Sequence, residues 1–534
     1  MTSYQRADRL RKQAVECAST GFVSIKKGTD PVNIKRAKEE IKDTIAAYLL
    51  KDEFGEYKIP AIRQRPVLLI GPPGVGKTQI MEQIARECEI GLVAYTITHH
   101  TRQSAVGLPF IQHKIYGGKE YSVTEYTMSE IIASVYDRIR ETGLKEGILF
   151  IDEINCVSET LAPTMLQFLQ CKTFGSHKVP EGWIIVAAGN PPEYNKSVRE
   201  FDVVTLDRIK KIIIEPDLAV WKEYAYAQNI HPAIMSYLNI RPQYFCTVET
   251  TVDGKRFATP RGWEDLSQLI QVYESLGKKA DRDVVGQYLQ HPKIAKDFAN
   301  YLELYYKYQD QYQVDEILSG TIREEICDKL DKASFDERMA VTGLLLAKLT
   351  DGFKALKLMN AEMTLLMAQL KQFKKESDGA DVHGPAPVMI LESIGAELES
   401  IRIHKKESGL SDRTQDRIYR KVKEALEQYV QQMKALSLQE KEDSWNWLRQ
   451  QFMEKSDAYE EKKESCGKQL EHAFDFMEAA FANGQELVIF VTGLNTGEAS
   501  VEFLKEYNCE RYYRYNRELL FDDQESRMKE VLEK

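Results

Sequence analysis

The first residues whose types and spacing could do chemistry form a glycine-rich stretch, Gly71-Pro72-Pro73-Gly74-Val75-Gly76-Lys77-Thr78. The stretch fits the pattern GxxxxGK(S/T), in which backbone N–H groups cradle phosphates. Its glycines let the backbone approach the phosphates, and the start of the following helix adds partial positive charge. Lys77 would contact the β- and γ-phosphates, and the Thr78 hydroxyl would hold Mg²⁺. The stretch therefore predicts binding of ATP with Mg²⁺, whereas the alternative is a Gly/Pro turn that carries a surface lysine.

Two adjacent carboxylates, Asp152 and Glu153, form the second candidate group. They follow the apolar run 147–151, which suits a buried strand, and carboxylates placed there are costly unless a cation or polar group satisfies them. Asp152 fits a role linked to Mg²⁺, and Glu153 fits a base that polarises an attacking water. Alone, a strand that ends in Asp-Glu often marks only the exit into a loop. Downstream of the phosphate loop, the pair predicts hydrolysis of the bound nucleotide.

The elements that must position these residues are strands that alternate with helices. Short apolar runs predict four strands, at residues 66–70, 91–98, 147–151 and 182–188. Apolar residues spaced three to four apart predict a helix over residues 30–50. Such alternation predicts an α/β fold, with a parallel sheet covered by helices on both faces.

Beyond about residue 216 the strand signals thin out, and the sequence predicts helices. Thr259 is a plausible N-cap for one of them, with Pro260 at its first position. Past residue 320, apolar stripes at helical spacing predict long helices, which form either a bundle core or coiled-coil seams. Glycines and prolines near residues 377–390 predict a loop there. We therefore expect an N-terminal extension (1–29), a nucleotide-binding core (30–216), a helical lid (217–320) and a mainly helical C-terminal region (321–534).

The composition is that of an ordinary folded protein. Of 534 residues, 43% are hydrophobic and 29% are charged, and the formal net charge is −10. This acidic balance disfavours a general binder of nucleic acid, although a local basic groove is compatible with it. Neither a signal peptide nor a run of about 18 apolar residues occurs, so we expect a cytoplasmic protein without membrane insertion. The eight cysteines are scattered, which argues against structural zinc and a disulfide scaffold.

Several motifs together resemble those of AAA+ ATPases, and within that superfamily they resemble the MoxR group. In chain order they are the phosphate loop, Asp152-Glu153-Ile154-Asn155, Ala187-Ala188-Gly189-Asn190-Pro191-Pro192, Leu206-Asp207-Arg208 and Thr259-Pro260-Arg261. The resemblance covers about residues 30–320. It points to the MoxR group through the DEIN tetrad and through the Asn-Pro that ends the fourth strand. It implies a P-loop AAA+ sheet with a helical lid, and it leaves the C-terminal region outside.

The resemblance also implies roles for three further residues. Asn190 matches the sensor that contacts the γ-phosphate or the attacking water, and its alternative is a turn-initiating asparagine. Arg208 matches the arginine finger supplied to the ATP of the neighbouring subunit, with Arg199 as its competitor and a surface salt bridge as its alternative. Arg261 matches the second sensor in the lid, where a guanidinium suits bidentate contact with phosphate. Its alternative is an ordinary surface charge.

A finger supplied to a neighbour requires head-to-tail contacts, which close into a ring if the rotation allows, and we expect a hexamer. Proteins that resemble MoxR act as chaperone-like remodelers of protein clients, often with a partner that carries a von Willebrand factor A domain. Residues 107–126 predict a β-hairpin around Gly117-Gly118. By resemblance, this hairpin is an insertion that faces the central pore, and residues 172–180 occupy the place of a second, shorter loop.

Two other functions are compatible with the same scaffold. A nucleic-acid-dependent motor or restriction-type NTPase would need a basic channel and salt-sensitive binding of DNA or RNA. A nucleotide-gated scaffold would bind ATP and hydrolyse it negligibly, which the intact Glu153, Asn190 and Arg208 disfavour.

Three further features have no assigned role in this interpretation. Tyrosines within residues 301–312 favour helix packing over base stacking, because acidic residues are interleaved with them. Residues 510–517 carry Arg511, Arg514 and Arg517, which suggest an anion-binding surface, with stacking of arginine on tyrosine as the commoner alternative. The apolar segment 487–492 is either a small strand or a buried helix end.

Overall fold

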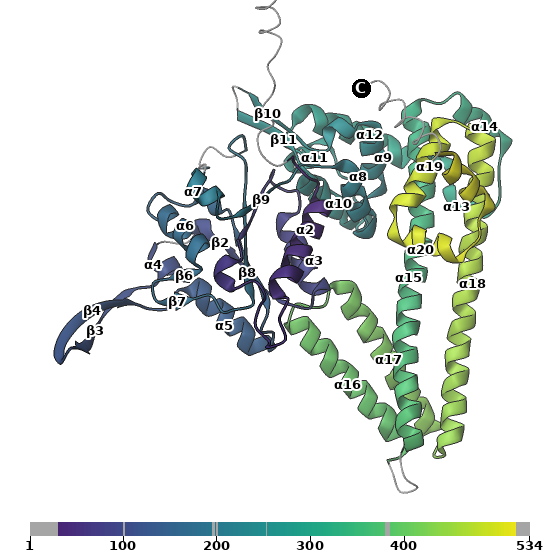
Figure 1. Ribbon diagram of the computed structural model, residues 1–534. Coiled ribbons are helices and arrows are strands. Elements are labelled where there is room, and N and C mark those ends of the chain that lie inside the picture. Colours follow the sequence, from purple (N-terminus) through teal and green to yellow (C-terminus); the bar gives the residue numbers. More distant parts are fainter. Residues whose placement is uncertain are drawn as a thin grey trace, which may run out of the picture.

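The computed structural model describes residues 30–99, 102–194, 198, 201–251, 254–379 and 385–519. Within these residues a five-stranded parallel sheet forms the centre of the N-terminal part (Figure 1). In spatial order its strands are β2 (Gly91–Thr96), β5 (Gly147–Asp152), β8 (Trp183–Gly189), β1 (Val67–Ile70) and β9 (Lys210–Ile213). The parallel sheet and the four expected strands are confirmed.

Helices cover both faces of the sheet, which confirms the α/β class. On one face pack α2 (Ile34–Leu49) and α3 (Lys77–Glu87), and on the other α5 (Glu130–Thr142) and α6 (Ala162–Cys171). Successive strand residues point to opposite faces, so Leu149 packs toward α5 and α6 while Phe150 packs toward α2 and α3. Burial on both faces explains why these strands are continuous apolar runs. Shorter helices complete the core: α4 (Arg102–Val106) and α7 (Val203–Leu206).

The edge strand β9 was missed in the sequence. It has four residues, two of them lysines, and it pairs only with β1 within the described sheet. Its two lysines interrupt the isoleucines of residues 209–214, and a four-residue edge strand depends on its neighbour for its position.

The hairpin expected within residues 107–126 is confirmed. It consists of β3 (Pro109–Tyr116) and β4 (Lys119–Tyr126), which pair along their full length and project away from the core (Figure 1). Its turn residues Gly117 and Gly118 have φ values of 57° and 79°, which a two-residue turn requires and which glycine adopts without strain. A second, much shorter hairpin, β6 (Thr173–Phe174) with β7 (His177–Lys178), lies within residues 172–180.

The lid is helical, as expected, but it also contains a hairpin that the sequence analysis missed. Strands β10 (Thr247–Thr251) and β11 (Gly254–Ala258) pair in antiparallel fashion. Thr259 caps the next helix by accepting a hydrogen bond from the Gly262 N–H at 3.2 Å, so the predicted helix start is confirmed. The lid helices are α8 (Leu218–Ala227), α9 (Pro232–Ile240), α10 (Pro260–Ser275), α11 (Arg282–Tyr288), α12 (Pro292–Tyr312) and α13 (Val314–Leu318).

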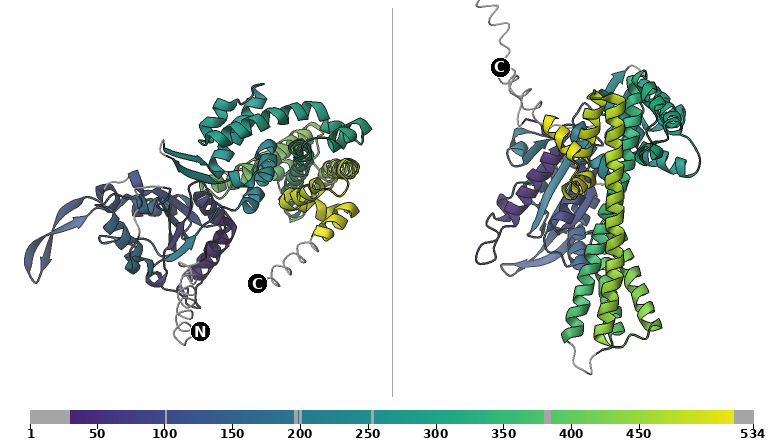
Figure 2. Two further views of the ribbon diagram at one scale, coloured as in Figure 1. Left: turned by 90° about the horizontal axis from the view of Figure 1, so that it is seen from above. Right: turned by 90° about the vertical axis from the view of Figure 1, so that its right-hand side faces the viewer.

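Two very long helices dominate the C-terminal region: α15 (Phe335–Gly379) and α18 (Lys441–Phe481), which lie side by side (Figures 1 and 2). The other helices are α14 (Glu324–Asp331), α16 (Pro387–Glu407), α17 (Arg413–Ala435), α19 (Gln485–Thr496) and α20 (Glu498–Glu506). The segment 487–492, which could have been a strand, is therefore helical. The apolar stripes of α15 pack into multi-helix cores, as the bundle interpretation expects.

The C-terminal helices contribute to two separate cores. A proximal core joins the lid to the first part of α15, the last part of α18, α19 and α20. A distal core joins the last part of α15 to α16, α17 and the start of α18. The proximal core continues across residue 320, so the lid and the first turns of α15 pack as one body. The domain boundary expected there stays a prediction.

The tyrosines of α12 and the arginines near residue 511 are engaged in contacts within the molecule. Tyr301, Tyr305, Tyr308 and Tyr312 are buried, which confirms that they pack. For residues 510–517 the favoured alternative, stacking of arginine on tyrosine, is confirmed, because Arg514 lies over the ring of Tyr515. Carboxylates also pair with these guanidiniums, which disfavours an anion surface: Glu471, Asp475 and Glu478 surround Arg511, and Glu478 pairs with Arg514.

In the described part of the chain, no single helix has the length and apolarity to cross a membrane. Helices α19 and α20 together meet that test by length and composition, with a bend of 91° between them. Both contribute buried side chains to the proximal core.

Candidate active site

The phosphate loop connects β1 to the start of α3, the context that its motif requires. Gly74 and Gly76 have φ values of 78° and 92°, in the left-handed region that glycine adopts readily. Gly76 directly precedes the helix, so the free N–H groups of the first turn of α3 face the loop. This geometry is suited to binding a phosphate.

Lys77 lies at the centre of the site and is only 7% exposed. Its ammonium donates to the carbonyl oxygens of Gly71 and Pro72, both at 2.8 Å, and to Asn190 Oδ1 at 3.0 Å. The pKa of Lys77 is lowered to about 8, mainly by burial and in part by Arg261, while Asp152 and Glu153 oppose the shift. A buried ammonium with neutral oxygen partners can exchange them for the stronger charge of phosphate oxygens.

The two carboxylates lie at the carboxyl end of β5, beside the phosphate loop. Thr78 donates its hydroxyl to Asp152 Oδ2 at 3.1 Å, so the two groups expected to hold Mg²⁺ are in contact. Hydroxyl and carboxylate oxygens are ligands that Mg²⁺ prefers, and the residues present therefore fit this ion. Glu153 accepts a hydrogen bond from Thr98 at 2.8 Å. Its φ of 58° is unusual for a side chain larger than glycine and costs about 1–3 kcal/mol, a strain typical of functional positions.

Asn190 is held by a partner that the sequence analysis did not assign to the site. Asn155 donates to the backbone carbonyl of Asn190 at 2.8 Å and accepts from its N–H at 3.3 Å. Gly189 leaves room for this pair, because a Cβ there would lie 2.4 Å from Asn155 Oδ1. Asn155 therefore fixes the end of β8, and with it the amide that contacts Lys77. Its place in the DEIN tetrad is the signal that could have found it.

Arg261 comes from the lid to the phosphate loop. It follows Pro260 in the first turn of α10, and a Cβ on Gly74 would lie only 3.0 Å from the Cβ of Arg261. The lid helix thus packs directly against the loop, at a position where only glycine leaves enough room. The guanidinium is close enough to Lys77 to affect its pKa.

Arg208 does not join this group among the described residues. It follows α7 and donates a hydrogen bond to Gln170 of α6. Its competitor for the finger role, Arg199, lies outside the described residues. The structure therefore brings together Lys77, Thr78, Asp152, Glu153 and Asn190 from the core with Arg261 from the lid. The role of Arg208 stays a prediction.

Chemically, this group combines a phosphate cradle, a pair of oxygen ligands for a divalent cation and a carboxylate positioned to accept a proton. Those are the components of phosphoanhydride hydrolysis.

Residues 67–208 match the family described as "ATPase family associated with various cellular activities (AAA)". The match begins at β1 and ends at Arg208, so this part of the chain is an AAA ATPase domain.

No curated protein matches the chain. Among solved structures, the chain is similar to the "crystal structure of a putative ATPase" from Cytophaga hutchinsonii ATCC 33406, with 18% sequence identity and a TM-score of 0.21. The similarity covers 34% of this chain and 52% of the other, so this chain spans about half the length of that protein.

Proposed function

We propose that the chain is a ring-forming AAA+ ATPase of the MoxR type, which couples ATP hydrolysis to the remodelling or maturation of a protein client. One observation carries the enzymatic part of the proposal: Lys77 bonds to Asn190, and Thr78 bonds to Asp152 beside Glu153, in one site. The match of residues 67–208 to the AAA family supports the same chemistry.

In this mechanism the phosphate loop and Lys77 bind the β- and γ-phosphates. Thr78 and Asp152 hold Mg²⁺, which neutralises phosphate charge. Glu153 accepts a proton from the attacking water, and Asn190, fixed by Asn155, orients that water without adding charge. Arg261 closes the site from the lid. Arg208 completes the site of the adjacent subunit, a role supported by its position away from the site of its own chain.

The proposed work on a protein client depends on the MoxR resemblance and on the projecting hairpin. Ile111 and Ile115 of β3 are 71% and 75% exposed, so this ribbon offers apolar side chains to another molecule. Exposed apolar groups of this kind are typical of protein contacts. A partner with a von Willebrand factor A domain, the hexameric state and a cytoplasmic location are proposed from the resemblance alone.

The proposal is tested with Glu153→Gln, which keeps the shape of the side chain and removes its basicity. We expect Mg·ATP affinity to stay within about twofold while turnover falls by about 100-fold or more. Glu141→Gln, which changes an exposed carboxylate on α5, is the matched control and should behave as wild type. Retained hydrolysis by Glu153→Gln would remove Glu153 from the role of base. Strong, salt-sensitive stimulation by DNA would favour the nucleic-acid motor instead.

A further inference from the structure

The turn between α16 and α17 returns to the AAA core. Residues 408–412 connect α16 to α17, and we call them the elbow. Arg138, near the end of α5, donates to the carbonyl of Glu407 at 3.2 Å and to the carbonyl of Ser408 at 2.8 Å. The contact joins residues that are about 270 positions apart in the chain and lies where α16 and α17 approach the core (Figure 1).

The chemistry of this contact is that of a capped helix end. The last carbonyls of α16 lack intrahelical partners and carry partial negative charge, so a guanidinium is a favourable partner for them. Gly409 follows with a φ of 69°, and a Cβ there would lie 2.9 Å from Arg138 Nη2. The elbow backbone is thus shaped to let the guanidinium approach closely.

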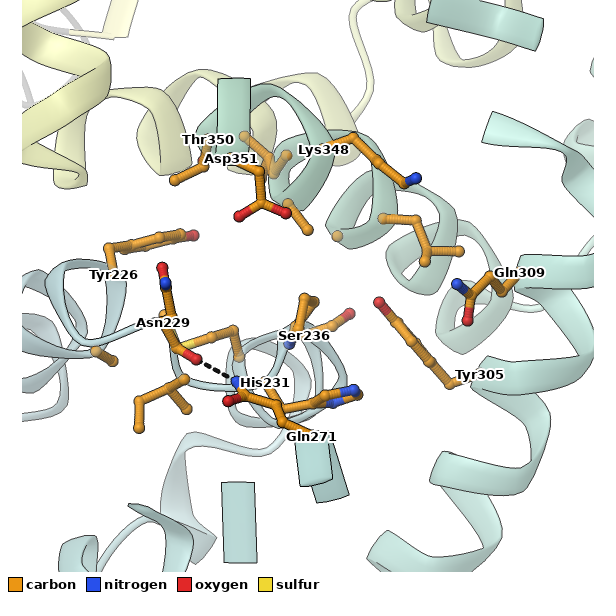
Figure 3. A pocket seen from close by; sticks show the side chains of 18 of the residues that line it. Tyr226, Asn229, His231, Ser236, Gln271, Tyr305, Gln309, Lys348, Thr350 and Asp351 are labelled. Carbon is orange, nitrogen blue, oxygen red and sulfur yellow. Dashed lines mark hydrogen bonds between the residues drawn. The ribbon is translucent and has the colours of Figure 1, made fainter. Parts of the chain in front are cut away.

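The elbow is connected to the lid through α15. Ser236 of α9 donates to the carbonyl of Met339 at 2.9 Å, and Arg241 pairs with Asp336 at 3.0 Å. A cavity of about 450 Å³ lies between the lid and α15, and Figure 3 shows Asp351 of α15 across it from Ser236 of α9 and Tyr305 of α12. Because lid and α15 also share the proximal core, a movement of the lid carries α15 with it.

Between the proximal and distal cores, the two long helices are weakly packed. Residues 357–365 of α15 and 449–465 of α18, all of them described, contribute no buried side chain. We call these two segments the neck. A cavity of about 270 Å³ lies beside it, lined by Met359, Met363 and Ala458 among others. We call α15 to α18 together the arm, and the neck is therefore the part of the arm that can bend most easily.

We propose that the elbow contact is a latch that couples the position of the lid, and hence nucleotide binding, to the C-terminal arm. The lid contacts the core directly, for example through the ion pair of Lys35 with Glu223 and the hydrogen bond from Gln79 to Tyr224. It is also tied to the core indirectly, through α15 and the Arg138 contact at the elbow. In the described structure the latch is closed while Arg261 lies against the phosphate loop. A rotation of the lid must either bend the neck or open the latch, so the nucleotide site and the elbow influence each other reciprocally.

Because this proposal rests on the proposed ATP binding, its test reads both sites at once. Hydrogen exchange of the purified full chain is measured with and without a non-hydrolysable Mg·ATP analogue. We expect protection of the phosphate loop together with a severalfold change in exchange at Leu410, whose N–H bonds to the carbonyl of Lys405 in the elbow. If the analogue protects the phosphate loop from exchange but leaves exchange at the elbow unchanged, the latch proposal is wrong and the ATP-binding proposal stands. If the analogue does not protect the phosphate loop from exchange, both the latch proposal and the ATP-binding proposal are wrong.

Arg138→Ala should weaken Mg·ATP affinity by about fivefold, which is the lower end of typical coupling between sites. In this variant, exchange at the elbow should also become independent of nucleotide. Arg138→Lys should restore part of the coupling, because one ammonium can still bond to a carbonyl. Arg140→Ala is the matched control, since Arg140 lies on the same helix, pairs with Asp137 and is mostly exposed. Equal affinities for Arg138→Ala and Arg140→Ala would overturn the latch.

Discussion

At the residue scale, Lys77 shows how the protein environment sets the chemistry of a single group. Its ammonium is buried beside neutral oxygens, and its pKa is lowered from 10.5 to about 8. Phosphate oxygens stabilise the charged form, so nucleotide binding should raise this pKa again. The charge of Lys77, and with it the affinity for ATP, therefore becomes sensitive to pH close to neutrality.

We expect Mg·ATP affinity to fall as the pH rises through about 8, because the neutral amine attracts phosphate less strongly, and binding above that pH should take up a proton. Isothermal titration calorimetry in buffers of different ionisation enthalpy measures both effects. Lys77→Arg, whose side chain stays charged, should lose the pH dependence.

The stability of the nucleotide-free protein should depend on pH in the opposite direction to its affinity for Mg·ATP. The unfolded chain binds more protons between pH 8 and 10.5, so the free energy of unfolding rises with pH over that window.

At the element scale, the two cores of the C-terminal region separate the stability of the distal bundle from that of the nucleotide site. Phe373 of α15 is fully buried in the distal core, whereas the phosphate loop lies against a different set of side chains. Phe373→Ala should destabilise the distal bundle by about 3–5 kcal/mol through lost burial and a cavity.

Scanning calorimetry and limited proteolysis of α16 and α17 measure this loss. Met389→Ala, an exposed position on α16, is the control and should change little. Mg·ATP affinity in Phe373→Ala should fall no further than in Arg138→Ala, because loosening the bundle affects the nucleotide only through the elbow. A complete loss of nucleotide binding would show that the AAA domain depends on the distal core.

At the scale of the whole molecule, the position of Arg208 makes the complete active site a property of two subunits. Arg208 bonds to Gln170 of α6 instead of the group around Lys77. If it completes a neighbouring site, Lys77→Ala and Arg208→Ala should each be inactive alone. An equal mixture should recover about one quarter of wild-type turnover, because random assembly in a ring pairs an intact loop with an intact finger at one interface in four.

Steady-state ATPase assays of the separate and mixed variants measure this recovery after the subunits have exchanged. The control is a mixture of Lys77→Ala with the double variant Lys77→Ala/Arg208→Ala, which contains no intact loop and should stay inactive. A mixture of the single variants that remains inactive, with exchange verified by size-exclusion chromatography, would remove Arg208 from the finger role.

Local patterns of residues predict the features that depend on a few consecutive positions. Gly76, Lys77 and Thr78 specify a left-handed turn and a helix start within one short window. Gly117 and Gly118 specify a hairpin turn, and Thr259 specifies a helix cap, in the same local manner. Their backbone conformations are limited by steric and hydrogen-bonding rules that act over a few residues, so local patterns are sufficient to predict them.

Contacts between groups that are far apart in the chain depend on the packing of whole elements. Asn155 pairs with Asn190 because η3 (Ile154–Cys156), directly after β5, comes beside the end of β8. Arg261 reaches the phosphate loop because the lid core orients α10, and Arg138 reaches the elbow because two long helices extend from that same core. The edge strand β9 likewise depends on β1. These contacts depend on how large apolar surfaces fit together, and no short stretch of residues contains that information.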